Sequence, residues 1–438
     1  MKKTLFSLIS VGCSLISHSQ NNNSVSQDTL KPNIVQSIKD KQIDVKLYGF
    51  IRQDITFDTR QTVDVREGSV LMWPADVKFD KNNHDINSAS QLQMLAILSR
   101  VGLKISMNDI LNAKASGLIE GDYFGNAESG INEFRLRHAW ISLDWKKTQL
   151  GIGQYWHPLT IPEMFPFTVN FSGGAPYMPF NRNPQVRLSQ KLNQNLTVQA
   201  TVLSQRDFTA NTLPYINSSI PATNLQFQYK TSKFLAGIAG HFEQVRPKIS
   251  SGTENLYSNE RANSFTTMAF VKYITNPLTI KAQATLAQNA GSFIMLGGFV
   301  GYTPENGGLE VYETMNTQSY WLDIAGNGNK WIPGLFVGYS KNNGTSENNY
   351  SSANGYKAAA YGFPATVSGI GAGNGSRTIN YIYRIAPRIE FKAKNLKFGL
   401  ETEYSFAQWG DANFRGTANH NLNNVDNLRV NFATTLTF

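Results

Sequence analysis

The sequence has one cysteine among 438 residues, and only 16% of its residues are charged. The single cysteine, Cys13, excludes a scaffold held by disulfides. No apolar run beyond the N-terminus approaches ~18 residues, which excludes a protein that crosses a membrane with helices. The 26 Phe, 18 Tyr and 7 Trp exclude a collagen or a disordered tail. The low charge and abundant Gly, Asn, Ser, Thr and Tyr favour many short strands joined by polar loops.

Catalytic and cofactor motifs are also missing. The six histidines are scattered without metal-ligand spacing, and neither G-x-S-x-G nor a phosphate-binding G-x-x-x-x-G-K-[ST] occurs. We therefore expect no metal, no cofactor and no enzyme. We expect no nucleic-acid partner either, because the chain has no basic run and carries an export signal. An outer-membrane hydrolase remains an alternative, since His157, His420 and Asp411 lie near predicted strand ends.

The N-terminus resembles a secretory signal peptide. Lys2 and Lys3 precede the apolar stretch from Leu5 to Ile16, and the small residues Ser17 and Ser19 follow. This order predicts cleavage after Ser19. We predict three regions, namely a signal peptide (1–19), a short periplasmic segment (20–44) and a membrane-embedded barrel (45–438).

Beyond this region apolar and polar residues alternate with a period of two. This pattern is typical of β-strands that have one apolar and one polar face. In the last segment the apolar face holds Leu428, Val430, Phe432, Thr434, Leu436 and Phe438. The alternation predicts sixteen strands, near 46–58, 91–106, 112–125, 133–145, 148–157, 184–192, 196–206, 222–230, 234–245, 263–274, 278–290, 317–325, 331–341, 377–392, 396–409 and 425–438.

Short and long links alternate along these strands. Short links include 146–148, 193–195 and 231–233, and a longer one near 108–112 joins the second and third strands. The long links are predicted at 59–90, 126–132, 158–183, 207–221, 246–262, 291–316, 342–376 and 410–424. This alternation of short and long links is typical of an outer-membrane barrel, which has tight periplasmic turns and long outer loops. It is not expected for a β-sandwich.

The chemistry of the two faces decides which face points outward. A strand that crosses lipid must place its apolar face outside, so the charged face must line the interior. We therefore predict an all-β fold, a 16-stranded antiparallel transmembrane β-barrel with long outer loops. Sixteen strands leave a lumen that side chains alone do not fill, hence an aqueous channel.

The strand residues that are predicted to face the lumen are rich in arginine. The arginine side chain is suited to bind carboxylates and phosphates. We expect an anion-attracting wall, although each arginine could instead serve only in a salt bridge within the wall. The predicted pore-lining or constriction residues are Arg52, Arg100, Lys104, Arg135, Arg137, Glu163, Arg182, Arg187, Arg384, Arg388 and Glu390.

The link 158–183 is rich in proline and aromatic residues. Proline restricts its conformations, and Gly173-Gly174 permit a sharp reversal. We expect this third outer loop to fold into the lumen and narrow it; a contact with a neighbouring subunit is the alternative. The residues expected to pack this constriction loop are Phe165, Phe167, Phe171, Tyr177 and Phe180.

The stretch from Arg135 to Ser189 resembles the DcaP-like porins of Gram-negative outer membranes. The matching marks are Arg135-x-Arg137-x-Ala139, Gly153-Gln154-x-Trp156, Pro162-Glu163, Phe171, Arg182-Asn183-Pro184-Gln185-Val186-Arg187 and the opening Tyr48-Gly49-Phe50-Ile51-Arg52. The resemblance implies a homotrimer of sixteen-stranded barrels that prefers small anions such as dicarboxylates. Abundant Asn and Lys, with Gln20 at the cleavage site, suggest a host of the Bacteroidota type.

These features together predict a porin of the outer membrane that lets small hydrophilic solutes diffuse passively and favours anions such as carboxylates. Its expected partners are outer-membrane lipid and lipopolysaccharide, small anionic solutes, two further copies of the chain, and the barrel assembly machinery acting through the last strand, which ends at Phe438. Two alternatives stay open, namely a substrate-specific uptake channel and an adhesin or structural barrel whose lumen is blocked by loops such as 291–316.

Overall fold

A computed structural model describes residues 43–206, 212–346, 349–363, 366–370 and 376–438. The predicted signal peptide and nearly all of the predicted periplasmic segment lie outside the described residues. Within the described part of the chain, no helix is long and apolar enough to cross a bilayer.

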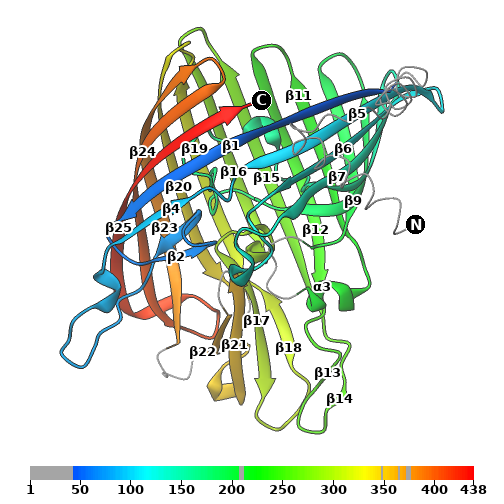
Figure 1. Cartoon of the computed structure of the whole chain (residues 1–438). Coiled ribbons are helices and arrows are strands. Elements are labelled where there is room, and N and C mark those ends of the chain that lie inside the picture. Colours follow the sequence, from blue (N-terminus) through cyan, green and yellow to red (C-terminus); the bar gives the residue numbers. More distant parts are fainter. Residues whose placement is uncertain (1–42, 207–211, 347–348, 364–365, 371–375) are drawn as a thin grey trace, which may run out of the picture. The chain divides into compact units, whose positions relative to one another are not determined.

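The residues from Val45 onward form one compact unit, an antiparallel barrel (Figure 1). The first half of its wall consists of β1 (Asp44–Asp58), β4 (Gln91–Leu95), β5 (Arg100–Ile110), β6 (Ala113–Asp122), β7 (Arg135–Asp144), β8 (Thr148–Trp156), β9 (Arg182–Lys191), β10 (Leu196–Leu203) and β11 (Ala222–Lys230). The second half consists of β12 (Phe234–Val245), β15 (Ala262–Ile274), β16 (Leu278–Gln288), β19 (Asn316–Gly326), β20 (Trp331–Gly344), β23 (Arg377–Ala393), β24 (Leu396–Ala412) and β25 (Ala418–Thr437).

The barrel closes between its first and last strands. β1 pairs with β25 from Phe50 opposite Thr437 to Asp58 opposite Arg429. On its other edge β1 pairs with both β4 and β5, which are two pieces of one wall strand. The seventeen segments of the sheet therefore form sixteen strands, as the alternation predicts, and closure leaves no sheet edge open to lipid.

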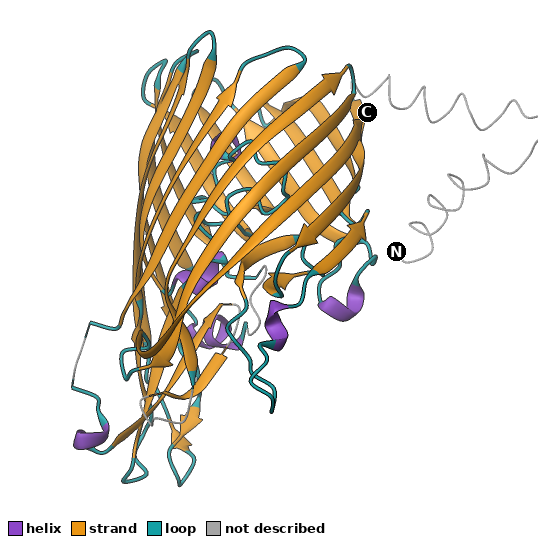
Figure 2. Ribbon diagram, turned by 90° about the vertical axis from the view of Figure 1, so that its left-hand side faces the viewer, coloured by secondary structure: helices purple, strands orange, loops and turns teal. Residues whose placement is uncertain are grey.

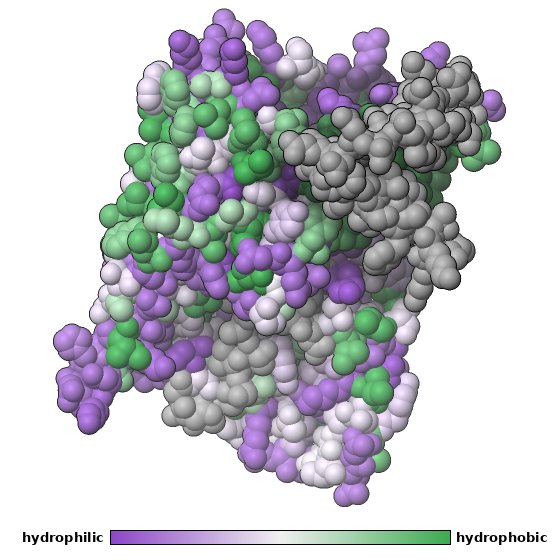
Figure 3. Space-filling model, viewed as in Figure 1, coloured by the Kyte–Doolittle hydropathy of each residue, from purple (hydrophilic) through white to green (hydrophobic). Residues whose placement is uncertain are grey.

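Exposure alternates along the strands as the period of two requires. In β25, Leu428 is 42% and Phe432 is 39% exposed, whereas Arg429 and Asn431 are 2% exposed or less. Figure 3 shows hydrophobic residues gathered on the barrel wall, with hydrophilic residues at the rim of short turns and over the long loops. The predicted orientation, apolar face outward and charged face inward, is confirmed.

Three predicted boundaries are wrong. The second strand is interrupted at 96–99, where the consecutive Ile97 and Leu98 are both buried at 2% or less; two adjacent inward side chains are incompatible with a regular strand. The link expected at 108–112 is only 111–112, and the long link expected at 410–424 is only 413–417. There the polar residues continue a hairpin of β24 and β25 instead of forming a loop, as in Asp411 opposite His420.

The long loops carry the remaining elements. They are β2 (Thr62–Val65), β3 (Val70–Pro74), β13 (Ser250–Ser251), β14 (Leu256–Tyr257), β17 (Gly297–Pro304), β18 (Val311–Thr314), β21 (Tyr356–Phe363), β22 (Thr366–Ile370), the helix α3 (Leu213–Ser218), and the 3-10 turns Ile86–Ser88, Glu128–Gly130, Pro162–Met164, Ala290–Phe293 and Ser352–Asn354. The strands β17, β18, β21 and β22 form one small sheet, which joins the sixth and seventh long loops.

A hydrophobic core lies inside the barrel. It combines residues of the first long loop (59–90), such as Met72 and Trp73, with residues of the third long loop (158–183), such as Met164 and Phe180, and with Phe293 of the sixth (291–316). Figure 2 shows loop segments inside the barrel, in the space that the strands enclose. These three loops therefore shape the interior.

Candidate channel interior

The third long loop is held inside the barrel by carboxylates of the wall that accept its backbone N–H groups. Phe167 N donates to Asp323 Oδ2 of β19 at 3.1 Å. Val169 N and Asn170 N donate to the two oxygens of Glu401 in β24, at 3.0 and 2.9 Å. A buried N–H group that loses its acceptor costs free energy, so these contacts fix the loop to the wall. The inward fold expected from proline and aromatic content is confirmed.

Basic side chains of the wall bind carbonyl groups of the same loop. Arg52 Nη2 donates to Val169 O at 2.5 Å, and Lys281 Nζ donates to Phe165 O at 2.6 Å. Arg384 Nη1 donates to Ala175 O at 3.2 Å. Wall charges of both signs therefore serve to position this loop, a role that the sequence did not indicate.

The aromatic residues of the third long loop pack in two places. The ring centroid of Phe180 lies 5.9 Å from that of Phe165 and 6.2 Å from that of Phe171. The ring centroid of Tyr177 lies 6.0 Å from that of Phe336 in β20. Phe167 differs, because its ring is 42% exposed and lies 3.5 Å from the Lys281 ammonium.

A charged cluster joins β5, β6 and β7. Arg137 contacts Glu120 at 2.7 Å and Asp122 at 2.8 Å. Arg135 contacts Asp122 at 2.8 Å, and Arg100 lies 3.6 Å from Glu120. We name these five residues the β5–β7 cluster; it holds three arginines and two carboxylates. The lining residues predicted from the sequence did not include Glu120 and Asp122, although both lie on one face of β6.

Arg182 lies beside the β5–β7 cluster. Its guanidinium is 4.8 Å from the Trp156 ring centroid, and that of Arg137 is 5.5 Å from the same ring. Arg182 is 1% exposed. The structure thus brings Arg100, Arg135, Arg137 and Arg182 together on one side of the barrel.

The other predicted lining residues are distributed around the wall. Arg52 pairs with Asp54 at 2.5 Å, and Arg388 with Asp323 at 2.8 Å. Glu163 pairs with Lys230 at 2.8 Å, and both are about half exposed. The remaining contacts are Arg384 with Glu403 at 3.3 Å, Glu390 with Lys397 at 2.6 Å, and the Lys104 ammonium 4.9 Å from the Tyr48 ring centroid. Arg187 Nη2 donates to Trp156 O at 2.7 Å.

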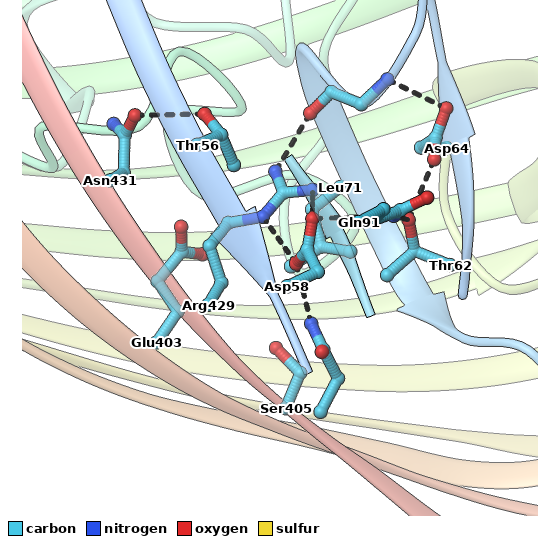
Figure 4. A network of polar contacts seen from close by, with 12 residues as sticks. Thr56, Asp58, Thr62, Asp64, Leu71, Gln91, Glu403, Ser405, Arg429 and Asn431 are labelled. Atoms are coloured by element: carbon cyan, nitrogen blue, oxygen red, sulfur yellow. Dashed lines mark hydrogen bonds and ion pairs between the residues drawn. The ribbon is translucent and has the colours of Figure 1, made fainter. Parts of the chain in front are cut away.

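The first long loop also enters the barrel, which was not predicted from the sequence. Arg429 makes a bidentate pair with Asp58, with both distances 2.8 Å, and its third nitrogen donates to Gly68 O at 2.7 Å (Figure 4). Arg384 donates to Leu71 O at 2.9 Å. The uninterrupted apolar run from Val70 to Trp73 is the sequence signal for this burial.

The sixth long loop meets the third at a pair of histidines. Asn181 Nδ2 donates to Ser292 O at 2.8 Å, and Phe180 N donates to Phe293 O at 3.0 Å. The Phe293 ring lies 5.2 Å from His157 and 5.4 Å from His241, whose rings are 4.8 Å apart. Burial lowers the pKa of His157 well below its usual value, and His241 and Arg187 act in the same direction.

Solved structures with the same architecture are proteins of the outer membrane. The DcaP channel of Acinetobacter baumannii shares 16% identity, covers 90% of this chain and 97% of its own, and superposes with a TM-score of 0.62. An anion-selective porin from Comamonas acidovorans shares 10% identity over 90% of this chain and 100% of its own, with a TM-score of 0.51. The trimer form of OmpT from Vibrio cholerae shares 11% identity over 90% of this chain and 99% of its own, with a TM-score of 0.50. At these identities the likeness shows the fold alone.

Sequence comparison identifies the family. No curated protein sequence matches the chain. The family model of the DcaP outer membrane protein matches residues 16–261, which is more than half of the chain. Together with the closed sixteen-stranded barrel, this match shows that the chain belongs to the DcaP outer membrane protein family and is a porin-like channel of the outer membrane.

Proposed function

We propose that the chain is a diffusion channel for small hydrophilic solutes that favours anions such as carboxylates. The observation that carries this proposal is the composition of the β5–β7 cluster, where three arginines face two carboxylates. Arg182 adds a further positive charge beside it. A net positive wall in a low-dielectric barrel raises the local concentration of anions in the lumen.

Two further cations support the same preference. Lys104 is exposed, and no carboxylate forms an ion pair with it among the described residues. Arg187 likewise has no carboxylate partner within the described part of the chain. The inward carboxylates Asp323 and Glu403 form their ion pairs with Arg388 and Arg384, and not with Lys104 or Arg187.

The proposal assigns the lining and constriction to the residues predicted from the sequence. The third long loop forms the constriction, and Glu163 and Arg182 are its charged members. The wall arginines shape the field, and the aromatic residues of the loop hold its form. Arg135, Arg137, Arg182 and Arg384 are 4% exposed or less, so they act on a solute through their field more than by direct contact.

A substrate-specific channel is the second candidate. The observation that favours it is the hydrophobic core inside the barrel, to which the first, third and sixth long loops all contribute. Three inward loops leave less room than one and favour a narrow, selective path over a wide pore.

Liposome swelling separates these candidates. Purified protein in liposomes is exposed to solute pairs of equal size, one neutral and one anionic, such as arabinose and arabonate. A diffusion channel that favours anions predicts faster swelling with arabonate and a smooth fall in rate with solute size. Swelling by only one solute of each size class would favour the specific channel. No swelling with any solute would contradict both.

The quaternary structure and assembly are also proposals. We propose a homotrimer, in line with the family resemblance and with the trimer form of the similar OmpT structure. Lipid and lipopolysaccharide surround its apolar wall, and the barrel assembly machinery recognises the strand ending at Phe438, whose ring is 51% exposed. Native mass spectrometry in detergent is expected to give three times the mass of the mature chain; a monomer would contradict the proposal.

A further inference from the structure

A cationic and aromatic patch lies on the inner wall where β7, β8 and β9 meet. Arg187 points inward from β9, because its neighbours Val186 and Leu188 point outward with 49% and 48% exposure. It lies opposite Gly151 of β8 and Thr201 of β10. Arg187 lies near the middle of β9, and Tyr155 lies one residue before the end of β8 that leads into the third long loop.

Neutral groups alone hold the Arg187 guanidinium. Its Nε and Nη2 donate to Gln185 Oε1 at 3.0 and 2.6 Å, and Nη2 also donates to Trp156 O at 2.7 Å. In the described part of the chain no carboxylate pairs with it, and Nη1 makes no hydrogen bond. Arg187 therefore differs from Arg137, which contacts two carboxylates. A half-buried guanidinium with a free donor nitrogen is available to an anion.

Two aromatic rings adjoin this guanidinium. The rings of Trp140 and Tyr155 are stacked, with centroids 5.2 Å apart and planes 29° apart. The Arg187 guanidinium carbon lies 5.8 Å from the first ring and 5.7 Å from the second. All three side chains are half-buried and therefore keep some accessible surface.

Gly151 creates the space for this arrangement. A Cβ atom added there would lie 1.9 Å from Cζ2 of Trp140, so the indole lies directly against the glycine. The absence of a side chain at Gly151 therefore lets Trp140 pack against β8. Arg187 of β9 is the residue paired with Gly151, so the indole lies near Arg187.

We propose that Arg187, Trp140 and Tyr155 form a binding subsite for small aromatic carboxylates in the channel. The carboxylate accepts hydrogen bonds from the free edge of Arg187, and the planar ring of the solute packs against the exposed surface of the two aromatic side chains. An aliphatic carboxylate also accepts the hydrogen bonds from Arg187, but it has no planar ring to stack on the two aromatic side chains. The inference rests on the proposed function, since the solute must enter an anion-favouring lumen.

The test compares benzoate with cyclohexanecarboxylate as blockers of single-channel current in a planar bilayer. The two acids carry the same charge and are similar in size, but only benzoate has an aromatic ring. Ring stacking predicts that benzoate reaches half-block at a concentration roughly 3- to 10-fold lower. Equal half-block concentrations in the wild-type channel would overturn the proposal.

Variants assign the effect to the patch. Trp140→Leu is expected to abolish the preference for benzoate, while Trp140→Phe retains an aromatic ring and keeps most of it. Arg187→Gln is expected to weaken block by both acids alike. Trp331→Leu is the matched control, because Trp331 is 60% exposed at the short-turn rim beside Phe391 and outside the patch. A preference that survives Trp140→Leu would contradict the subsite.

The same recordings separate this inference from the proposed function. Under a salt gradient the wild-type channel is expected to show an anion-type reversal potential. If the reversal potential has the cation sign, the proposed function fails. If it has the anion sign and the two acids block equally, only the aromatic subsite fails. Because every variant must conduct current to be measured, misfolded protein does not enter the comparison.

Discussion

The side chain of Glu401 in β24 accepts the backbone N–H of Val169 at 3.0 Å, across 232 positions of sequence, and its second oxygen accepts the N–H of the next residue at 2.9 Å. One buried carboxylate thus holds the centre of the third long loop against the wall. Asp323 holds Phe167 in the same way. The position of this loop therefore depends on carboxyl groups of the barrel wall.

Replacing Glu401 is expected to loosen the third long loop. Glu401→Ala leaves two backbone N–H groups without their acceptor, at a cost of about 1–3 kcal/mol for each buried group. The loop then samples other positions, and single-channel recordings are expected to show more current noise and a less uniform conductance.

The control for this change is Glu390→Ala. Glu390 is also inward and buried, but it pairs with Lys397 near the short-turn rim. It is expected to leave the noise unchanged. Equal noise in wild type and Glu401→Ala would show that the carboxylate does not hold the loop.

Neutralising Asp122 is expected to destabilise the barrel and to strengthen its preference for anions. Asp122→Asn leaves Arg135 and Arg137 with one carboxylate fewer in a buried cluster, and loss of one partner of a buried ion pair costs about 3 kcal/mol or more. Thermal unfolding followed by circular dichroism, together with the reversal potential, measures both effects. Asp80→Asn, in the exposed part of the first long loop, is the control. A more stable variant, or one with weaker anion selectivity, would disagree with this assignment.

Acidification is expected to weaken the contact between the third and sixth long loops. Burial lowers the pKa of His157 in the folded state, so the unfolded or displaced loop binds more protons. The contact is therefore fully stable above the unfolded pKa of about 6.5 and loses up to about 1.4 kcal/mol for each pH unit below it. Current noise is expected to rise between pH 7 and pH 5.

Variants of the histidines test this pH dependence. His157→Gln removes the titrating group and is expected to flatten the response, most fully together with His241→Gln, because the two rings are in contact. His420→Gln, in an exposed position near the loop end of β25, is the control. An unchanged pH response in the double variant would assign it to other groups.

Removing the Phe293 ring is expected to widen the channel. Phe293 is 1% exposed and packs on both histidines, so Phe293→Ala costs about 3–5 kcal/mol and frees the tip of the sixth long loop. A larger single-channel conductance is expected. Phe79→Ala, whose ring is 62% exposed in the first long loop, is expected to leave conductance unchanged. Equal conductance in both variants would mean that the sixth long loop does not narrow the path.

The sequence predicted the barrel well because lipid imposes a strict physical pattern. Each strand must have one apolar face toward lipid, as in the segment from Leu428 to Phe432. Because this pattern repeats along the chain, the number of strands and the residues that face inward could be predicted. The third long loop was also predictable, since its prolines and aromatic residues are unsuited to an exposed loop. The split of the second strand was not, because the burial of Ile97 and Leu98 depends on loops that fill the interior.

The partners of the wall charges could not be predicted. Parity places Arg384 and Arg388 inside, but only the register of distant strands and the path of the loops show that they bind Glu403 and Asp323. The same limit applies to the first long loop, whose residue Leu71 is separated from Arg384 by 313 positions. Non-local contacts of this kind leave no periodic signal in the sequence.

The reversal potential of the wild-type channel under a potassium chloride gradient tests the central claim most directly, namely that the lumen carries an excess of positive charge. The account predicts the sign of a channel that passes chloride more readily than potassium. A potential of the opposite sign, recorded from channels with normal conductance, would contradict it.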